Sequence, residues 1–474
     1  MSSEESAGAG AAGPSCVLSR LLVFALFVIP VLSACGSMPP SAPLCPDEIL
    51  RRAEALRRPR EATGDLTLAQ ATRHMRTNNP EVRRARAAYR TALAVASTPT
   101  PRPNPTFEIS PLALWGGEIL GSVAGGVDAA LGWTILPTNT PRLQDSVNAV
   151  TARAALTEAA GVERLQYLAL RREYAGTILE DLRFRSWTAL AETARASVST
   201  ARRLAEAGAA TGLDGRLVEL EADRSDVDVV AAREQRVAAV SRLAARMGRT
   251  REDLEPPPES FLPPLPSTLP TPETLRSLAM LHHPDLAVLR AQYTVAEKQL
   301  RLEYARRVPP FGIGASYERE GDLNILGLPI SIEIPLSDRN QPGIAEAYAR
   351  RCELQARYLA LLEDVLAAVE SSRALVAVRV ERHRMIVERL EPSSTQAMTA
   401  ARTALAAGGA DALRLLEVLR STRAIALDGV AARIDVYDAW IELEEACGAP
   451  LLCFTDEPGQ PDSSAPPEHE EKQS

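Results

Sequence analysis

The chain of 474 residues repeats itself at a spacing near 200 residues. The stretch "NNPEVRRARAAY" from Asn78 matches "HHPDLAVLRAQY" from His282, and "ARRLAEAGAATG" from Ala201 matches "ARTALAAGGADA" from Ala401. A tandem duplication restricts the fold to two similar units, and this limits the possible structures more than any single motif does. A proline-rich segment, residues 255–272, divides the two units and cannot be helical.

Both units show the same order of predicted elements. A first helix (66–95 and 273–307) is followed by two short strands, a very long helix (141–207 and 341–407), a glycine-containing break and a second long helix (213–247 and 411–446). At a rise of about 1.5 Å per residue, each of the longest helices extends for about 100 Å. Pro392 predicts a kink in the second of them. Aromatic residues make up only 4% of the chain, which is typical of long packed helices rather than of compact α/β domains.

The strands are predicted from strict alternation. In the second unit Phe311, Ile313, Ala315 and Tyr317 share one face, and Leu328, Ile330, Ile332 and Ile334 share another, which indicates a sheet with one apolar and one polar side. In the first unit the pattern is less clear: strands are predicted near 107–115 and 131–135, with a loop over 116–128. After the last strand, Asn340 is predicted to cap the long helix and Pro342 to lie in its first turn.

The N-terminal segment has the pattern of an export signal. Arg20 precedes an apolar run from Leu21 to Leu32, which is too short to span a bilayer comfortably, and Ser33-Ala34-Cys35 follows. The segment resembles a bacterial lipoprotein signal, which implies cleavage before Cys35 and acylation of that cysteine. Gly36 is not the aspartate associated with retention in the inner membrane, so an outer-membrane location is favoured. The alternative is an ordinary secretory signal in which Cys35 is coincidental.

Several other functions are disfavoured by the sequence. The formal net charge of −8, without a concentrated basic stripe, argues against nucleic acid as a partner. No cysteine or histidine spacing indicates a metal site or a cofactor, and the counterpart of His282-His283 in the first unit is Asn78-Asn79, which suggests a polar helix turn. No catalytic constellation stands out, so we predict that the chain is not an enzyme. A disulfide among Cys45, Cys447 and Cys453 is plausible, with its connectivity open.

The strands also predict an oligomer. Four strands per chain cannot close a barrel in a membrane, because open sheet edges are not tolerated in lipid. Three chains would supply twelve strands and leave an open lumen, whereas two would supply eight, which side chains tend to fill. The predicted fold class is therefore mainly α, with long helical hairpins and four strands per chain that form a trimeric barrel.

These features together resemble the TolC-like outer-membrane efflux proteins, and most closely their lipidated heavy-metal branch. The resemblance rests on Cys35, the stretch at Asn78, "PLSDRNQPGIAEA" from Pro335, and the breaks at Gly208 and Gly408, and it covers about residues 65–447. It implies a homotrimer with a barrel in the outer membrane and a helical tunnel in the periplasm. Such a trimer would be the passive exit duct for metal ions or drugs, joined by a periplasmic adaptor (membrane fusion protein) to an inner-membrane RND-type transporter.

The resemblance and the repeat suggest a division of the chain. Residues 1–34 form the lipoprotein signal peptide and 35–64 a lipid-anchored segment. Residues 65–250 form the first structural repeat, 251–272 the crossover linker and 273–447 the second repeat. Residues 448–474 are predicted to be a disordered tail, being rich in proline and acidic residues.

The two breaks between long helices would lie at the far periplasmic tip. There Asp214 and Asp411 could ring the aperture and favour cations, or each could cap the helix that follows it. Gly208, Leu213, Gly408 and Leu413 are candidates for adaptor docking, or they could only shape the turns. The rival function is a structural periplasmic coiled-coil lipoprotein, an adaptor or tether without a pore. The alternating strands between 311 and 334 argue against it, because a tether needs no two-faced sheet.

Overall fold

The computed structural model describes residues 45–57, 65–115, 123–206, 211–251, 254–266, 268–320, 323–406 and 412–454. The chain divides into two compact units, residues 1–55 and 56–474. Helix α2 (Pro46–Arg57) spans their boundary, and Asp47 and Glu48 lie in its first turn, where carboxylates complement the helix dipole. All other described elements belong to the second unit. In the described part of the chain, no helix combines the length and apolarity needed to cross a membrane.

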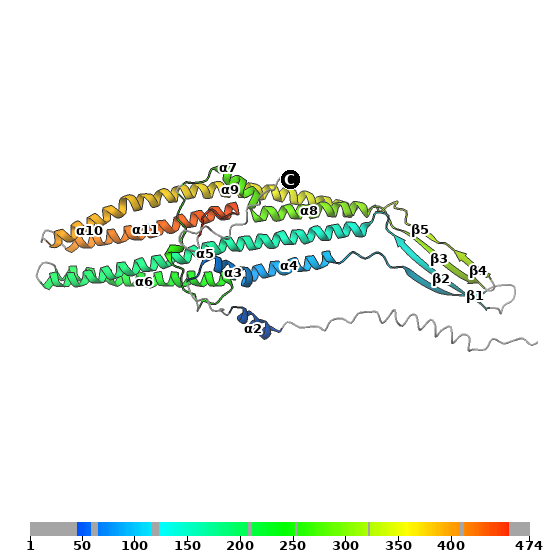
Figure 1. Cartoon of the computed structure of the whole chain (residues 1–474), viewed down its shortest axis with the longest axis horizontal. Helices are drawn as coiled ribbons and strands as arrows, with labels where there is room; N and C mark the ends of the chain where they lie inside the picture. The colour runs from blue at the N-terminus through cyan, green and yellow to red at the C-terminus, as the bar shows by residue number, and fades with distance from the viewer. Residues whose placement is uncertain are drawn as a thin grey trace, which may run out of the picture. The chain divides into compact units, whose positions relative to one another are not determined.

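The second unit contains two copies of one element order (Figure 1). The first half has α3 (Leu68–Asn78), α4 (Pro80–Ser97), β1 (Thr106–Trp115), β2 (Val123–Ile135), α5 (Thr140–Glu206) and α6 (Gly212–Met247). The second half has α7 (Pro272–His282), α8 (Pro284–Ala305), β3 (Phe311–Glu320), β4 (Leu323–Gly327), β5 (Ile330–Ile332), α9 (Gln341–Met385), η2 (Ile386–Leu390), α10 (Glu391–Ala406) and α11 (Ala412–Cys447). A short 3-10 turn, η1 (Glu259–Phe261), lies between the halves.

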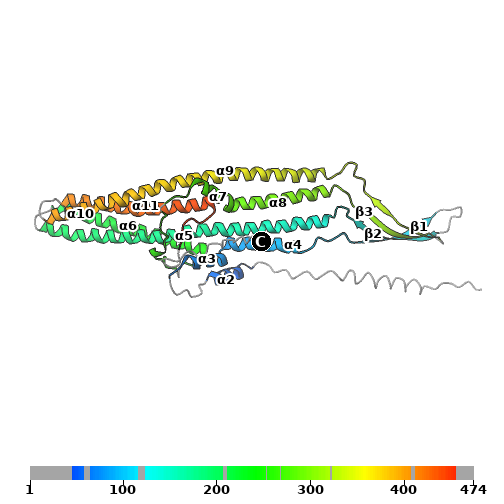
Figure 2. The same ribbon diagram turned by 45° about the horizontal axis from the view of Figure 1, so that its top comes forward.

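The sheet lies at one end of this unit and the long helical hairpins extend to the other end (Figures 1 and 2). Helix α5 contains 67 residues, or about 100 Å of helix, so it runs from the sheet to the far hairpin. In the second half the same path is divided by the π-helical turn η2, directly before Glu391-Pro392. Pro392 has no N–H to donate and its ring would collide with the carbonyl four residues earlier, so a widened turn relieves both problems. The interruption predicted from Pro392 is present.

Each predicted first helix is in fact two helices. The chain breaks at Asn79-Pro80 in the first half and at His283-Pro284 in the second. Proline disfavours a helical conformation in the residue before it, but fits the first position of a new helix. Asn79 caps α4, because its Oδ1 accepts from the N–H groups of Glu81 and Val82.

The sheet also differs from the prediction in the first half. Strand β2 begins at Val123, so residues 123–128 of the predicted loop are paired with β1. This segment, "VAGGVD", is rich in glycine, which propensity alone assigns to turns. Cross-strand pairing overrides that tendency here.

β4 and β5 are two parts of one strand. Both pair with β3 in a single register, because Ser316 faces Gly327 and Ile313 faces Ile330 without a bulge between them. The carbonyl of the intervening Pro329 also accepts from the N–H of Gly314 at 2.9 Å. The break at Leu328-Pro329 follows from the missing N–H of the proline. The sheet therefore has four antiparallel strands, as predicted, in the order β1-β2-β3-β4/β5.

The hydrophobic core occupies the middle of the unit, away from the sheet. It combines α3, α5, α7, α9 and α11 with the segment after α11, and its largest buried side chains include Met75, Tyr174, Trp440 and Phe454. Leucines and Phe261 of the proline-rich linker pack against it from outside. The linker is also fixed by a hydrogen bond from the Tyr437 hydroxyl to the carbonyl of Pro263, 2.6 Å long. The core thus holds both halves and the linker together.

Two glycines end the returning helices in the same way. Gly248 follows α6 with φ of +70° and Gly448 follows α11 with φ of +66°, a left-handed conformation that glycine adopts without strain. A Cβ at Gly248 would lie 2.7 Å from the carbonyl oxygen of Asn78, and one at Gly448 would lie 2.7 Å from the Cα of His283. Each returning helix therefore ends directly against the break between the first two helices of its own half.

We predict that Gly248→Ala and Gly448→Ala each lower the free energy of unfolding by at least about 1–2 kcal/mol, because the left-handed backbone strains alanine and the Cβ collides with fixed backbone. Gly176→Ala is the control, since an added Cβ in the middle of α5 meets nothing within 4 Å. It should stabilise the chain by up to about 1 kcal/mol through helix propensity. Urea titration of the three variants tests this, and equal effects at all three glycines would contradict it.

Candidate membrane surface and channel wall

Over the rows from Ile135 to Tyr317, one face of the sheet is apolar and exposed, and Arg319 marks its end. The pairing registers bring Phe107, Leu131, Ala315 and Leu328 into one row across the sheet. Neighbouring rows on this face include Ile109 with Tyr317, and Trp133 with Ile313 and Ile330. Leu328 is 82% exposed and Ile330 is 72% exposed. Water-facing sheets do not present such a continuous apolar surface, so another apolar phase must cover it.

The opposite face is small and acidic. Between the apolar positions of β2 and β3 lie Ala130, Gly132, Gly312, Gly314 and Ser316, which leave room above the sheet. The charged side chains described on this face are all carboxylates: Glu108, Asp128 and Glu318. Such a face attracts cations and repels anions.

Both long edges of the sheet are open. Within the described residues, β1 pairs only with β2, and β4 and β5 pair only with β3. Natural proteins rarely leave a ten-residue edge such as β1 uncovered, because its free N–H and C=O groups recruit other strands.

The corner between sheet and helices is fixed by two asparagines. Asn139 and Asn340, each just before a long helix, have φ of 51° and 56°, which asparagine tolerates better than other non-glycine residues. The prediction that the Asn340 side chain caps α9 is wrong, since it makes no capping hydrogen bond. Its Nδ2 donates instead to the backbone and side chain of Glu303 at 2.9 and 2.8 Å. The side chain is thus used to hold α8 against the start of α9. Pro342 lies in the first turn of α9 as predicted.

A buried ion pair joins the long helix α5 to the end of α11. Arg171 and Glu444 have no exposed side-chain surface, and two hydrogen bonds of 2.9 and 2.7 Å link them. Arg171 also donates to the carbonyl of Leu452, and Glu444 accepts from the N–H groups of Leu451 and Leu452. Burial opposes the charge of Arg171, but the Glu444 carboxylate raises the pKa of the guanidinium above its ordinary value.

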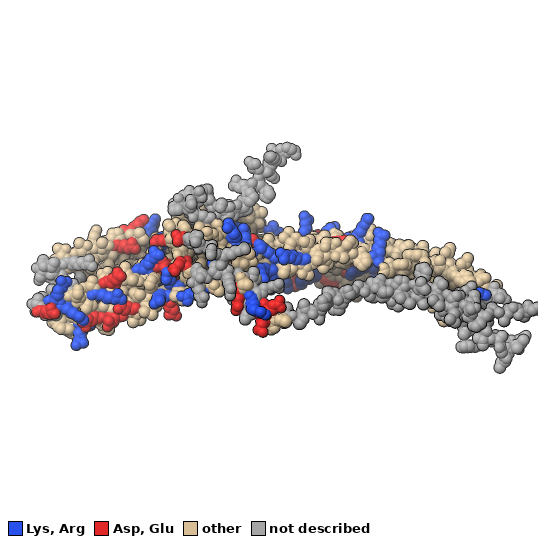
Figure 3. Space-filling view, turned by 60° about the horizontal axis from the view of Figure 1, so that its bottom comes forward, with Lys and Arg blue, Asp and Glu red and all other residues tan. Residues whose placement is uncertain are grey.

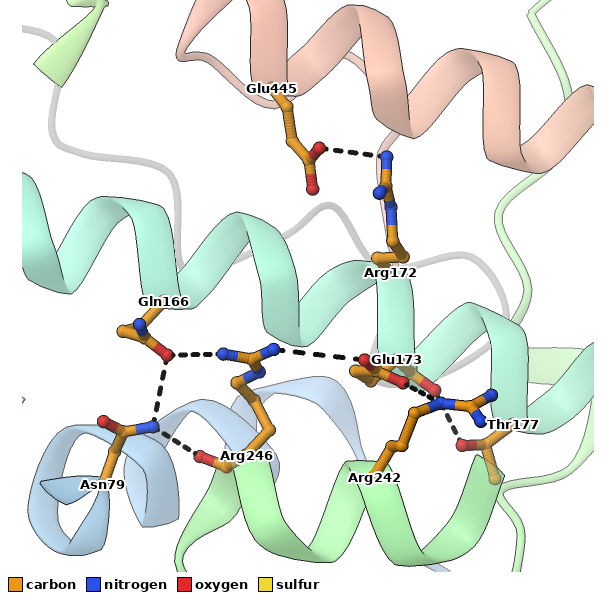
Figure 4. Close-up of polar contacts among 8 residues, drawn as sticks. All are labelled: Asn79, Gln166, Arg172, Glu173, Thr177, Arg242, Arg246 and Glu445. Atoms are coloured by element: carbon orange, nitrogen blue, oxygen red, sulfur yellow. Dashed lines mark hydrogen bonds and ion pairs between the residues drawn. The ribbon is translucent and has the colours of Figure 1, made fainter. Parts of the chain in front are cut away.

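A second polar network joins α4, α5 and α6 (Figure 4). The Nδ2 of Asn79 donates to the carbonyl of Arg246 at 2.9 Å and to Gln166, and Arg246 also donates to Gln166. On the same side, Arg242 donates to Glu173 at 3.1 Å. Because Asn79 is almost fully buried, these bonds hold the break between α3 and α4 in a single position.

The described part of the second half shows no equivalent of the Asn79 network. His283 occupies the matching position, and its buried Nδ1 has no hydrogen-bond partner in the described structure. Burial lowers the pKa of His283, and the charge of Asp285 raises it by less.

The free energy of unfolding should therefore fall as the pH drops below about 6.5, the ordinary histidine pKa. Below this pH the unfolded chain takes up a proton that folded His283 resists, whereas above it the stabilisation is complete. We predict that His283→Asn flattens this dependence, while His282→Asn at the exposed neighbouring position leaves it unchanged. Unfolding curves between pH 5 and pH 8 test this, and an unchanged slope in His283→Asn would contradict it.

Charged contacts tie the two long hairpins together on their way to the tip. Arg423 of α11 is largely buried and pairs with Glu221 of α6 at 2.6 Å and with Asp228. Its guanidinium also lies 5.0 Å from the centre of the Trp187 ring on α5. Arg420 reaches the same Glu221 at 3.1 Å. These contacts fix the relative position of the α5–α6 and α10–α11 hairpins within one chain.

The predicted tip residues are only partly described. Leu213 is the second residue of α6 and is 69% exposed. Asp214 lies in the first turn of α6, after the helix has begun, and Leu413 is the second residue of α11. Gly208, Gly408 and Asp411 lie outside the described residues, and so does Cys35.

A disulfide and a metal site were also considered from the sequence. Cys45, Cys352, Cys447 and Cys453 are free, so the disulfide considered among Cys45, Cys447 and Cys453 is not formed. Cys447 is buried, which raises the pKa of its thiol to about 11. In the ranges that the structure describes, no group of three or more His, Cys, Asp or Glu side chains could hold a metal ion.

Comparisons with known proteins agree with this geometry. Residues 275–449 match the family model described as "Outer membrane efflux protein". The outer-membrane channel OprN has 18% sequence identity and a TM-score of 0.67, over 87% of this chain and 98% of that chain. CusC has 15% identity and a TM-score of 0.66, over 82% and 95%. The outer membrane protein VceC of Vibrio cholerae has 16% identity and a TM-score of 0.64, over 81% and 96%.

No curated protein gives a significant match to the sequence. The resemblance to outer-membrane efflux proteins at the level of the family is nevertheless confirmed. The second half of the chain matches the family model, and more than four fifths of the chain has the fold of outer-membrane channels.

Proposed function

We propose that three copies of this chain form a channel through the outer membrane that acts as a passive exit duct for substrates delivered from the cell. The observation that carries the proposal is the sheet, which combines an exposed apolar face, an acidic face and two open edges. Joining edge to edge closes such a sheet into a barrel with its apolar face toward lipid. No bond is made or broken, so the energy for transport would come from a partner.

The strand directions are compatible with closure. With four alternating strands, β1 of one copy runs antiparallel to the β4/β5 strand of the next copy, so the same ladder can continue around a ring. Three copies give twelve strands, enough for an open lumen, whereas two copies give eight, which side chains fill. Lipid requires complete closure, because an unpaired edge cannot be hydrated there.

The helices supply matching surfaces along the same ring. Helix α6 exposes Leu213, Leu220 and Val227 at a spacing of seven residues, and α9 exposes Val378 and Met385 at the same spacing. A seven-residue apolar spacing is the pattern that packs one helix against another. We infer that α6 of one copy packs against α9 and α10 of the next, which extends the barrel into a helical tunnel.

The remaining parts of the proposal rest on the resemblance to efflux channels. Lipidation of Cys35 would anchor each copy to the outer membrane. A periplasmic adaptor would dock at the hairpin tips, near Gly208, Leu213, Gly408 and Leu413, and would connect the channel to an inner-membrane RND-type transporter. Asp214 and Asp411 would ring the aperture. The acidic sheet face supports cationic cargo, such as metal ions or cationic drugs.

Two measurements on the detergent-extracted protein test the proposal. Unheated and heated samples on a gel report the oligomer, and planar bilayers report the conductance. We expect a heat-sensitive trimer and cation-selective steps of current. A monomer that conducts no current would overturn the channel and favour the alternative, a structural coiled-coil lipoprotein or tether.

A further inference from the structure

Four exposed arginines surround the corner where the sheet meets the helices. We call Arg102, Arg142, Arg307 and Arg339 the arginine rim. All four are exposed, and none forms an ion pair with a residue that the structure describes. Among the described residues, a single side-chain hydrogen bond involves the rim, from the Nε of Arg339 to the carbonyl of Pro335. Elsewhere on the helices many arginines are paired with carboxylates, as Arg202 is with Glu219.

The rim directly adjoins the apolar face of the sheet. The last paired row on the helix side contains Ile135, Phe311 and Ile332. Arg142, Arg307 and Arg339 each lie within seven residues of this row along the chain. Arg102 lies four residues before the start of β1, on the same side of the sheet. On the face shown in Figure 3, blue side chains project at the end of the helices next to the sheet, and the visible sheet surface is mostly tan.

Three carboxylates near the corner accept hydrogen bonds, and Glu333, directly after β5, is exposed. Glu303 is only 7% exposed and binds Arg306 and Asn340. Asp145 accepts from the N–H of Thr100 at 2.7 Å, and Asp338 accepts from the N–H of Asn340 at 2.8 Å. These bonds fix the three carboxylates in place, and none of the three forms an ion pair with a rim arginine in the described structure. The four rim arginines outnumber the two exposed carboxylates of the corner, Glu333 and Asp338, although the whole chain is acidic.

Two exposed aromatic residues lie on opposite sides of the rim, Trp133 on the sheet side and Tyr304 on the helix side. Trp133 belongs to the apolar face, one pleat away from the last row, and is 46% exposed. Tyr304 lies in the last turn of α8, three residues before Arg307, and is 52% exposed. Tryptophan and tyrosine favour the level of lipid headgroups, because one end of the ring system is apolar and the other is polar.

We propose that the arginine rim binds the phosphate groups of anionic phospholipids in the leaflet on the helix side of the membrane. The inference rests on the proposed function, since it requires the sheet to lie in lipid. With the apolar rows in the hydrocarbon and Trp133 near the headgroups, the next charges toward the helices meet the lipid phosphates. Guanidinium groups bind phosphate through two parallel N–H donors, and their long side chains can reach the headgroup layer.

Native mass spectrometry of the detergent-solubilised assembly, titrated with phosphatidylglycerol or phosphatidylcholine, tests the inference. We expect retention of phosphatidylglycerol to exceed that of phosphatidylcholine by roughly tenfold at low salt, since each arginine near an anionic surface contributes a several-fold preference. The preference should fall as salt is added. It should disappear when all four rim arginines are changed to glutamine and persist when they are changed to lysine.

A matched control variant tests whether the lipid preference depends on the rim arginines or on exposed positive charge anywhere in the chain. Arg83, Arg90, Arg224 and Arg233 are also exposed and form no ion pair with a described residue, but they lie on α4 and α6. Changing these four to glutamine should leave the preference intact. An equal loss in both quadruple variants would overturn the inference, as would equal retention of the two lipids by the native chain. Competition by millimolar inorganic phosphate would also overturn it, by indicating a free-phosphate site.

Measuring the conductance of the same preparations shows whether a failure concerns the lipid-binding rim or the channel itself. The glutamine rim variant should still form trimers and conduct, because the rim makes no contact that closes the barrel. If the native assembly conducts but shows no lipid preference, only the proposed lipid binding by the rim is refuted. A non-conducting monomer refutes the channel. If the glutamine variant does not assemble, the lysine variant and the native chain still decide the lipid preference.

Discussion

Replacing Glu444 by glutamine should destabilise the folded chain by about 3–5 kcal/mol, the usual cost of leaving a buried charge without its partner. Arg171 would remain fully buried with its positive charge. The Oε1 of Glu444 also accepts from Arg171, Leu451 and Leu452, while Oε2 accepts from Arg171. A glutamine has only one acceptor oxygen, so its amide nitrogen would face donors whichever way it is turned.

Urea unfolding, followed by circular dichroism, measures the loss, and two further variants identify its cause. Arg171→Met combined with Glu444→Leu removes both charges and should recover part of the stability, although the backbone groups of Leu451 and Leu452 then lose their partners. Asp226→Asn breaks an exposed pair with Arg195 and should have little effect on the free energy of unfolding. If Glu444→Gln and Asp226→Asn had equal effects, the buried pair would not be what holds α11 against α5.

The parts of the fold that follow from local patterns were predictable from the sequence. The long helix expected over 141–207 is α5 at Thr140–Glu206, and the returning helix expected over 213–247 is α6 at Gly212–Met247. Period-two alternation identified the second pair of strands for the same reason: a residue's neighbours along the chain decide its face. The repeat then supplied the weaker elements of the first half by analogy.

The parts that depend on contacts distant in sequence were not predictable. Arg171 and Glu444 are 273 residues apart, and each is one of many charged residues on a long helix. Asn340 was predicted to cap a helix because that role is local, but its side chain instead reaches Glu303 in another helix. The glycines at 248 and 448 could have been found, because they share the 200-residue spacing of the other matches.

Phe107→Arg should prevent the assembly of a membrane channel, whereas Glu108→Arg should not. The two residues are neighbours on β1 and are both exposed, but the pairing register puts Phe107 on the apolar face and Glu108 on the acidic face. An arginine on the lipid face of a barrel costs about 2–4 kcal/mol at the midplane and less toward the headgroups. The cost is incurred in every copy, so a trimer incurs it three times.

Fractionation of cells and heat modification on gels report assembly, and reversal potentials in planar bilayers report selectivity. For Phe107→Arg we expect loss of the heat-sensitive oligomer from the outer-membrane fraction. For Glu108→Arg we expect a normal oligomer with weaker cation selectivity, because one carboxylate per copy on the channel wall becomes a cation. If Phe107→Arg were tolerated and Glu108→Arg prevented assembly, the acidic face would have to contact lipid, contrary to the proposal. That arrangement is physically unfavourable, because Asp128 and Glu318 on the acidic face would lose their hydration.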